Sequence, residues 1–454
     1  MAASTEPKLA TPALTDLGDD AVRHLQALLR IDTTNPPGNE TPAAEYLAQL
    51  FVAANIEPKL LGMTPERMNV VARLKGDGGK PPLLLAAHTD VVPVELDKWT
   101  HPPFAGEIHD GYLWGRGAID MKHMLVMCAL VLIRLKEEGV KLTHDVIFAG
   151  VADEEAGCDA GSRFLVDHHP ELVRAEFALG EAGAFTVRLN GAVLYPIGVA
   201  ERGAVWMKMR MRGAPGHGSM PREDNVVGRL GAAVSRLART RLPQHRTAVV
   251  ERYLGLVAAT QKFPNSFFMR RLFNRRIADF ALKRVPDRGQ AGATMAMLSN
   301  TAVPTVLRAG NKVNVIPGVA EAELDGRTLP TQTSADLIAE IKKVIEDDVE
   351  IEIMRDMPPV EADASTPLYA LLAEAIRRHH PGAVPVPYLM PGFTDAKSWS
   401  RLGTQCYGFM PVQFPDDGVK FGDLFHGHDE RIPVEGLKWG INVLYDVVKR
   451  FVTT

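Results

Sequence analysis

The sequence predicts an α/β fold with a small α+β domain inserted into it, and three observations lead to this prediction. The first 200 residues alternate short apolar runs with amphipathic stretches, a pattern typical of βαβ units. From about residue 201 the strands alternate apolar and charged residues, as strands with one solvated face do. After residue 356 the chain returns to buried types of element. We therefore predict a discontinuous first domain, residues 1–200 and 357–454, and an inserted domain, residues 201–356.

Length and composition bound the class of protein. A chain of 454 residues is too long for one ordinary core, so two domains are expected. Hydrophobic residues make up 46% and charged residues 23%, which is typical of a globular protein in water. The formal net charge of −4, with acidic residues spread along the chain, gives no indication of a nucleic-acid partner.

The sequence contains no recognisable targeting or membrane-spanning segment. Residues 1–16 lack the basic and then apolar stretches of a secretory signal, and no apolar run is long enough to cross a bilayer. Cys128, Cys158 and Cys406 are far apart and form neither a disulfide framework nor a zinc ribbon pattern. We expect a reducing, cytoplasmic location.

The apolar periodicity places the elements of the two predicted domains. In the first domain it predicts helices over 19–31, 41–55 and 122–139, strands over 69–76, 81–92, 144–155 and 175–183, and buried elements over 368–380, 404–412 and 435–451. In the inserted domain it predicts strands over 201–213, 319–329 and 349–354 and helices over 225–240 and 334–348. A long irregular stretch is expected between the first helix and the second strand of this domain.

Titratable side chains follow three predicted core strands at the point where each strand ends. They are His88 and Asp90 after the first, Glu154 and Glu155 after the second, and Glu181 after the third. In open α/β sheets, ligands bind in the crevice beyond the carboxyl ends of the strands. Asp120 follows a glycine-containing turn, and residues 425–430 add two histidines. We expect these side chains to gather at one site.

Histidine with several carboxylates is a ligand set that suits zinc, cobalt or manganese. Five carboxylates exceed what one zinc needs and match two metals about 3.5–4 Å apart that share a carboxylate. Asp90 is expected to accept the second ring N–H of His88. Residues 153–155 are expected to continue an extended segment, on which Glu154 and Glu155 point opposite ways, so one should ligate and the other act as a base. A lone histidine or a Glu-Glu pair is usually structural or solvated, but several such residues after buried strands favour a site.

Seven motifs in order give the sequence a resemblance to a known family. They span residues 28–40, 88–93, 115–122, 153–155, 216–221, 314–318 and 426–430. In this order they resemble the M20 family of metallopeptidases and aminoacylases, the relatives of carboxypeptidase G2, succinyl-diaminopimelate desuccinylase and aminoacylase-1. The resemblance implies a di-zinc peptidase-type catalytic domain with a mixed, largely parallel sheet, and an inserted α+β lid and dimerisation domain.

The resemblance also implies a role for each residue of the metal site. His88 and Glu181 would bind one zinc, Glu155 and His426 the other, and Asp120 would bridge them. Glu154 would be the general base that takes a proton from the metal-bridging water and passes it to the leaving nitrogen. His428 is the alternative to His426, but the family histidine stands four residues before a glutamate, which favours His426.

Residues of the inserted domain match family residues that act on the substrate. His217 resembles a histidine that reaches a neighbouring subunit's active site and stabilises the oxyanion, which implies a homodimer through the lid. By local sequence alone it is a loop histidine between flexible glycines. Asn314 and Arg327 match residues that contact substrate, and Arg327 would clamp a carboxylate through bidentate hydrogen bonds.

A C-terminal loop, residues 390–399, resembles the family's GGTDA loop. Gly392 and Thr394 are therefore expected to line the pocket for the substrate carboxylate. Phe393, which lies between them, departs from the commoner pattern.

The implied function is hydrolysis of an amide bond next to a free carboxylate, in an N-acyl amino acid or a short peptide. The alternatives are a short-chain deacylase of the acetylornithine or succinyl-diaminopimelate type and a non-catalytic binding relative. A binding relative would lack a ligand or the base, and neither is missing. No G-x-S-x-G, Walker A or G-x-G-x-x-G pattern indicates a serine hydrolase or a nucleotide site.

The segment over 247–305 is longer than the lid of a short-chain deacetylase requires. It resembles the carboxypeptidase S-like branch, whose members include hydrolases of N-fatty-acyl amino acids. At helical spacing Met269, Phe273, Ile277 and Phe280 share one face. This face is expected to accept a long acyl chain at the mouth of the site, to pack against the lid, or to lie on a membrane surface through nearby arginines.

Overall fold

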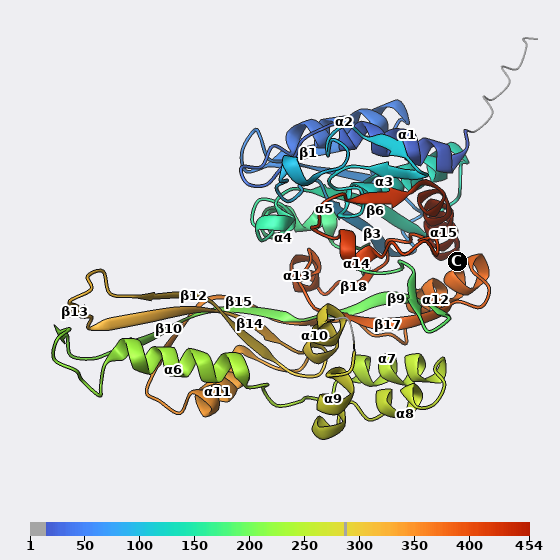
Figure 1. Ribbon diagram of the computed structural model, residues 1–454. Helices are drawn as coiled ribbons and strands as arrows, with labels where there is room; N and C mark the ends of the chain where they lie inside the picture. The colour runs from blue at the N-terminus through green and yellow to red at the C-terminus, as the bar shows by residue number, and fades with distance from the viewer. Residues whose placement is uncertain (1–14, 286–287) are drawn as a thin grey trace, which may run out of the picture.

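A computed structural model describes residues 15–285 and 288–454 (Figure 1). The predicted absence of a secretory signal falls largely on residues 1–14, which lie outside the described residues. Within the described ranges, no helix is long and apolar enough to cross a membrane.

Across the described residues, the first sheet has ten strands and is mixed. Its path runs β1 (Pro58–Gly62), β2 (Met68–Leu74), β6 (His144–Val151), β3 (Lys80–His88), β7 (Phe177–Gly180), β18 (Gln405–Gly408), β9 (Ala192–Glu201) and β16 (Val360–Glu361), while β8 (Val187–Leu189) and β17 (Val384–Met390) pair with β9 off this path. β3 is parallel to both β6 and β7, whereas β2 is antiparallel to β6. The predicted α/β class and the mixed character of the sheet are confirmed, and the sheet is partly parallel.

Both faces of this sheet are covered. One face carries α1 (Leu17–Leu29), α2 (Thr41–Ala53), α3 (Lys122–Glu137), α12 (Pro367–His379) and α15 (Val434–Thr453), and the other carries α4 (Ser162–His168), α5 (Pro170–Val173) and α13 (Ala396–Trp399). In β3, Leu83 and Leu85 belong to the first core, and Leu84 and Ala86 to the second. Burial on both sides explains why β3 is a continuous apolar run.

The inserted region forms a second, antiparallel sheet in the order β12 (Thr301–Ala309), β14 (Val319–Thr328), β10 (Gly203–Arg212) and β15 (Glu350–Met357). Helices α6 (Val226–Arg239) and α11 (Ser334–Ile345) contact this sheet and share a second core with it, in which Met207 and Ile341 are fully buried. The side chain of Thr333 and that of Asp336 cap α11 reciprocally. The short ribbon of β11 (Gly216–His217) and β13 (Val315–Ile316) lies at the far tip of this sheet (Figure 1).

Helices α7 (Ala248–Ala259), α8 (Asn265–Met269), α9 (Arg275–Leu282) and α10 (Arg288–Ala296) follow α6. Although they fall within residues 201–356, α7 packs on β17 of the first sheet, and Val249, Val250 and Leu254 join the first core. Figure 1 shows α7 and α8 beneath β17, away from α6 and α11. The division of the chain at residues 201 and 356 stays a prediction.

The sequence prediction was wrong in the stretch between α6 and β14. This stretch is not irregular, since it contains α7 to α10 and β12, which pairs with β14. Pro304 lies inside β12, and the register shifts between Pro304 and Val306. The single helical face expected over 269–280 is also wrong, because the chain forms two short helices, α8 and α9, with a turn between them.

The three remaining strands of the described chain form a small antiparallel sheet beside the first one. They are β19 (Arg431–Pro433), β5 (Tyr112–Trp114) and β4 (Glu107–His109), in that order. This sheet joins the chain just before Asp120 to the segment just after His426, because Trp114 pairs with Arg431. It therefore draws two distant parts of the sequence to one side of the first sheet.

Candidate metal centre

The candidate ligands gather at one edge of the first sheet. His88 is the last residue of β3, Glu181 follows β7, and Glu155 lies in a 3-10 helix (Glu154–Ala156) after β6. Because β3, β6 and β7 are parallel, their carboxyl ends meet at the same edge. Asp120 comes just before α3, and His426 follows α14 (Phe421–Leu424).

Two sets of ligand atoms converge on the carboxylate of Asp120. The Nε2 atom of His88 lies 3.1 Å from Oδ1 of Asp120 and 3.8 Å from Oε2 of Glu181. The Nε2 atom of His426 lies 2.9 Å from Oδ2 of Asp120 and 3.2 Å from Oε2 of Glu155. One oxygen of Asp120 therefore faces each histidine, an arrangement that allows two ions to share this carboxylate.

The donor atoms of this cluster fit a pair of cations. Among the described residues, potential ligand atoms of His88, Asp120 and Glu155 lie within 4.8 Å of one another, as do those of His88, Glu154 and Glu181. Oε1 of Glu155 is buried and accepts no hydrogen bond from any described residue. An orphaned buried acceptor costs about 1–3 kcal/mol, which a bound cation would offset. Nitrogen and carboxylate donors suit zinc and its neighbours.

The electrostatics of the cluster also call for positive charge. Burial, followed by the charge of Glu181, raises the pKa of the Glu154 carboxyl well above its usual value. Burial likewise raises the pKa of Glu181. Hydrogen bonds to Asp120 and Glu155 raise the pKa of His426 to about 10. Carboxylates this crowded must take up protons or cations.

The carboxylate of Asp90 bonds to the loop of the candidate base Glu154 at shorter distances than to the ring of His88. This carboxylate was expected to accept the second ring N–H of His88, but Nδ1 lies 3.0 Å from the main-chain oxygen of Asp90 and 3.5 Å from its carboxylate. That carboxylate accepts the backbone N–H groups of Glu154 and Glu155, both at 3.1 Å, and the amide of Asn35 at 2.9 Å. Asp90 therefore fixes the turn that carries the two glutamates.

The segment of the two glutamates is not extended, which corrects the sequence prediction. Asp153 adopts a left-handed conformation, with φ 67° and ψ 17°, and the next three residues form the 3-10 helix. The N–H of Ala160 and the guanidinium of Arg67 hold the Asp153 carboxylate, at 2.8 and 2.9 Å. In this turn Glu155 faces His426, while Glu154 lies in the group with His88 and Glu181.

Glu430 is a site residue to which the sequence assigned no role. Its buried carboxylate accepts the N–H groups of Gly117, Ile119 and Asp120 at 3.0, 2.8 and 3.1 Å, and Nη1 of Arg116 at 2.8 Å. It thereby holds the glycine-containing turn that presents Asp120. The signal in the sequence was its place four residues after the candidate ligand histidine.

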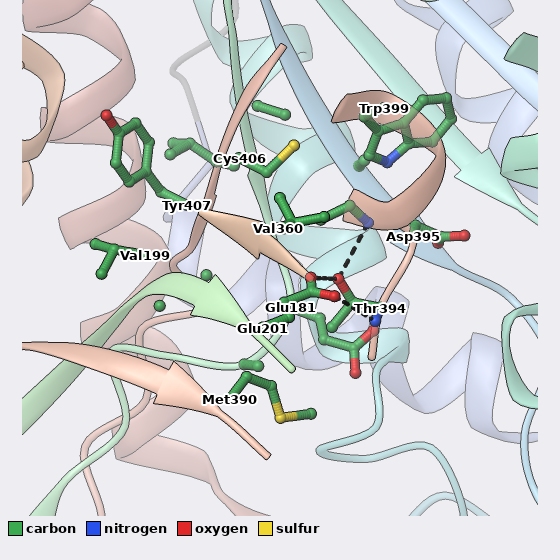
Figure 2. Close-up of a pocket in the computed structure, with 18 of the residues that line it drawn as sticks. Glu181, Val199, Glu201, Val360, Met390, Thr394, Asp395, Trp399, Cys406 and Tyr407 are labelled. Atoms are coloured by element: carbon green, nitrogen blue, oxygen red, sulfur yellow. Dashed lines mark hydrogen bonds between the residues drawn. The ribbon is translucent and has the colours of Figure 1, made fainter. Parts of the chain in front are cut away.

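A small pocket of about 40 Å³ lies beside the cluster and is lined by Glu181, Glu201, Thr394 and Asp395, among others (Figure 2). Thr394 donates its N–H to Glu201 at 3.1 Å, and its hydroxyl also bonds to that carboxylate. Burial raises the pKa of Asp395 to about 6. Thr394 lines this pocket, and both of its donors are engaged with Glu201.

Arg327 is the penultimate residue of β14 and lies close to the loop of Gly392. The Nε and Nη2 atoms of Arg327 lie 2.7 and 3.1 Å from the carboxylate of Asp325, and its Nη1 is buried without a hydrogen bond. The guanidinium carbon lies 5.9 Å from the centre of the Phe393 ring. The N–H of Gly392 faces the sulfur of Met390 at 3.4 Å.

The structure does not bring His217 and Asn314 to the cluster. Both lie in or beside the β11–β13 ribbon, where Gly218 donates to the carbonyl of Asn314 at 2.9 Å. His217 is exposed, and Figure 1 places the ribbon far from β3 and α13. His428 is exposed too, and the ion pairs with Asp120 and Glu155 are made by His426.

Comparison with known proteins shows the family. The model of peptidase family M20/M25/M40 matches residues 84–450. The chain belongs to this family. The probable carboxypeptidase S-like 2 of Dictyostelium discoideum is 29% identical over 408 residues, which cover 84% of this chain and 75% of that protein. The N-fatty-acyl-amino acid synthase/hydrolase PM20D1 of Xenopus tropicalis is 29% identical over 435 residues, which cover 92% and 83%.

Solved structures of M20 proteins share the fold of this M20 enzyme. The metallo-carboxypeptidase Sso-CP2 from Sulfolobus solfataricus superposes with a TM-score of 0.72 at 18% identity, over 96% of this chain and 100% of that one. The YXEP protein of Bacillus subtilis, described as a dinuclear metal-binding M20 peptidase, gives a TM-score of 0.61 at 15% identity, over 96% and 99%.

This M20 protein is a hydrolytic enzyme, as its family match and its relatives indicate. It carries candidate ligand groups for metal ions at the edge of the first sheet. All five side chains that the resemblance implied as ligands are present and lie together, and Glu154 lies beside them.

Proposed function

We propose that this M20 enzyme is a di-zinc hydrolase of N-acyl amino acids with long acyl chains, and that it cleaves the amide bond next to the free carboxylate. The observation that carries the proposal is the placement of His88 and His426 on the two oxygens of Asp120. The substrate class is supported by the name of the PM20D1 relatives, which refers to N-fatty-acyl amino acids. A dipeptide or a short-chain acyl amino acid is the alternative substrate.

Two zinc ions at this site would supply Lewis acidity and activate a water molecule. His88 and Glu181 would hold one ion, Glu155 and His426 the other, and Asp120 both. Cobalt or manganese would also serve, because they accept the same nitrogen and oxygen donors.

Glu154 would act as the general base. It would accept a proton from the attacking water and transfer it to the amide nitrogen as the carbon–nitrogen bond breaks, which releases a fatty acid and an amino acid. Asp90 would position Glu154, because its carboxylate accepts the backbone N–H of Glu154 at 3.1 Å.

Arg327 would bind the carboxylate of the substrate. Asp325 fixes the guanidinium by two hydrogen bonds, and the buried Nη1 remains available for an acceptor. Gly392 and Phe393 would border the same carboxylate. The expected bidentate clamp would require Arg327 to release one of its bonds to Asp325.

His217 and Asn314 would come from a second copy of the chain. The ribbon that carries them is remote from the metal cluster of its own chain (Figure 1), so in a homodimer formed through the inserted region they would complete the partner's site. There His217 would stabilise the oxyanion of the tetrahedral intermediate.

We further propose a cytoplasmic location, because the three cysteines are unpaired.

A panel of N-acyl amino acids and dipeptides, tested on enzyme treated with chelator and then supplied with zinc, would test the proposal. We expect chelation to abolish hydrolysis, zinc to restore it, and long-chain acyl amino acids to be cleaved best. Elemental analysis that finds no transition metal in active enzyme would contradict the metal site. Best cleavage of acetyl substrates would instead favour the short-chain alternative.

A further inference from the structure

A cavity of about 660 Å³ lies between helices α7 to α10 and the edge of the first sheet. Leu194 and Val386 of the sheet form one wall, and Val257, Met269 and Leu272 contribute to the other. The volume is within the range of about 300–1,000 Å³ that small-molecule sites occupy. An apolar ligand that enters an apolar cavity removes its own hydrocarbon surface from water, and this burial favours binding.

The chemistry of the lining is that of a hydrocarbon site. No acidic side chain lines the cavity within the described part of the chain, and its one charged lining residue there is Arg284. The guanidinium carbon of Arg284 lies 3.6 Å from the centre of the Phe280 ring, and Phe280 is 47% exposed. The charge therefore marks the solvent side of the cavity. Most of the other lining residues are apolar, and the polar uncharged ones among the described residues are Asn190, Tyr253, Asn265, Thr294 and Tyr388.

Strand β9 leads from this cavity to the metal cluster. Leu194 and Pro196 line the cavity. Gly198, the next residue on the same face of the strand, lines the small pocket that also contains the candidate ligand Glu181. The floor of the cavity thus continues into the wall of the active site.

Strand β17 makes the same connection beside β9, to which it is parallel. Val386 and Tyr388 line the cavity, and Met390, two residues further on, lines the small pocket (Figure 2). A chain that starts at the metal cluster and follows both strands backwards would enter the cavity and end near Val257, which packs with Leu194 and Val386.

A row of aromatic rings links the cavity to a candidate ligand on the other side. Phe185 lines the cavity and stacks on Phe421, with ring centres 3.9 Å apart and planes 4° apart. Phe421 contacts Phe425 at 5.8 Å, and Phe425 stacks on the His426 ring at 4.6 Å. Aromatic side chains therefore extend from the wall of the cavity to the metal cluster.

We propose that this cavity binds the acyl chain of the substrate, with the amide at the metal cluster and the chain end near Val257. The inference rests on the proposed hydrolysis of N-acyl amino acids and names the part of the protein that would select long chains. The surface involved differs from the expected helical face, because Met269 and Phe280 line the cavity while Phe273 packs under Arg246, 4.9 Å from its guanidinium carbon.

The test is a chain-length profile, from acetyl to dodecanoyl, for the wild-type enzyme and for Val257→Trp. Each methylene that enters the cavity should raise kcat/KM by up to about fourfold. The indole of Val257→Trp would occupy the space near Leu194 and Val386, so the ratio of kcat/KM for dodecanoyl over acetyl substrates should fall roughly 50-fold, as for about three excluded methylenes. Ala259→Trp, on the exposed face of α7, is the matched control and should keep the wild-type ratio.

The two proposals fail in different ways. If no N-acyl amino acid of any length is hydrolysed, the proposed function is wrong. If acetyl substrates are hydrolysed but the profile of the wild type is flat, or Val257→Trp and Ala259→Trp keep the same ratio, the assignment of the cavity is wrong. Dodecanoate added to the wild type tests whether the cavity holds the substrate's own acyl chain or whether a free fatty acid binds elsewhere. Competitive inhibition of acetyl-substrate hydrolysis supports our assignment. Non-competitive inhibition overturns it.

A second measurement uses only the wild-type enzyme and does not depend on the folding of a variant. A dodecanoyl amino acid with a photoreactive group at the end of the chain is irradiated with the enzyme, and labelled peptides are mapped by mass spectrometry. Labels in α7 or α8, which line the cavity, support the proposal. Labels confined to the β11–β13 ribbon or to the exposed surface overturn it.

Discussion

The buried carboxylate of Glu430 accepts the backbone N–H of Asp120 at a distance of 3.1 Å, although 310 residues separate the two in the sequence. Glu430 therefore holds the main chain of Asp120, the candidate bridging ligand, while the side chain of Asp120 faces His88 and His426. Since Glu430 also pairs with the buried guanidinium of Arg116, its charge is balanced inside the protein. The stability of this region and the geometry of the metal site depend on the same carboxylate.

Glu430→Gln should weaken both the fold and the metal site. The variant leaves the Arg116 charge buried without its partner, which should lower the free energy of unfolding by about 3–5 kcal/mol. The amide of glutamine pairs less well than the carboxylate with the three backbone N–H donors of the turn that presents Asp120. Metal affinity should therefore fall about 10–100-fold. Denaturant unfolding and zinc titration measure the two effects. Glu435→Gln, at an exposed position of α15, is the control, and equal behaviour of the two variants would contradict the prediction.

Glu154→Gln and Glu155→Gln should differ although the residues are neighbours. Glu154→Gln should lower kcat by about 10²–10⁴ with the metals still bound, because it removes only the base. Glu155→Gln should lose metal, because Glu155 faces His426 in the cluster. The measurements are kcat and metal content per chain. Metal loss in Glu154→Gln with retention in Glu155→Gln would mean that the two residues have exchanged roles.

The fold class and the convergence of the ligands could be predicted because both depend on local patterns. The continuous apolar run of β3 indicates a strand buried on both faces, and parallel strands must bring His88 and Glu181 to one edge. The helices after α6 could not be predicted in the same way. α8 and α9 have five and eight residues, too few for a clear helical period, and a proline such as Pro304 is unusual inside a strand.

The hydrogen bonds that support the ligands could not be predicted, because they depend on the direction of backbone groups. The left-handed φ of Asp153 turns the next two N–H groups toward Asp90, and nothing in an Asp-Glu-Glu run specifies that turn. Glu430 is a similar case, since its partners are main-chain groups of a distant segment. The cavity under α7 results from how helices pack on β9 and β17, which no periodicity in the sequence describes.

Arg327→Lys should weaken the binding of substrates that carry a free carboxylate. A lysine cannot hold the fixed fork of a guanidinium, so it loses the charge-assisted hydrogen bond from Nη1, and kcat/KM should fall about 10–100-fold, mainly through KM. The same amino acids with an amidated carboxyl group should be hydrolysed equally by both enzymes. Arg308→Lys, on the exposed part of β12, is the control. Equal losses with both substrate types would mean that Arg327 only supports the fold.

His217→Ala and Glu154→Ala chains should restore each other's activity in mixed dimers. His217 lies at the tip of the second sheet, away from the metal cluster of its own chain, so each mixed dimer would contain one site with both residues intact (Figure 1). Mixing equal amounts of the two inactive chains should therefore return up to about one quarter of the wild-type rate, if half of the dimers are mixed and one of their two sites works.

Subunit exchange must be demonstrated in the same experiment, by mass spectrometry of dimers that carry two different tags. Ser219→Ala, next to His217, tests the position of the ring, because the Ser219 hydroxyl lies 2.7 Å from Nδ1 of His217. A structural role of the loop would make Ser219→Ala as inactive as His217→Ala, whereas an oxyanion role needs the imidazole itself and leaves Ser219→Ala active. Complete exchange with no recovered activity would mean that His217 acts within its own chain or has no part in the reaction. A site shared between two chains could then not explain the loss of activity in His217→Ala.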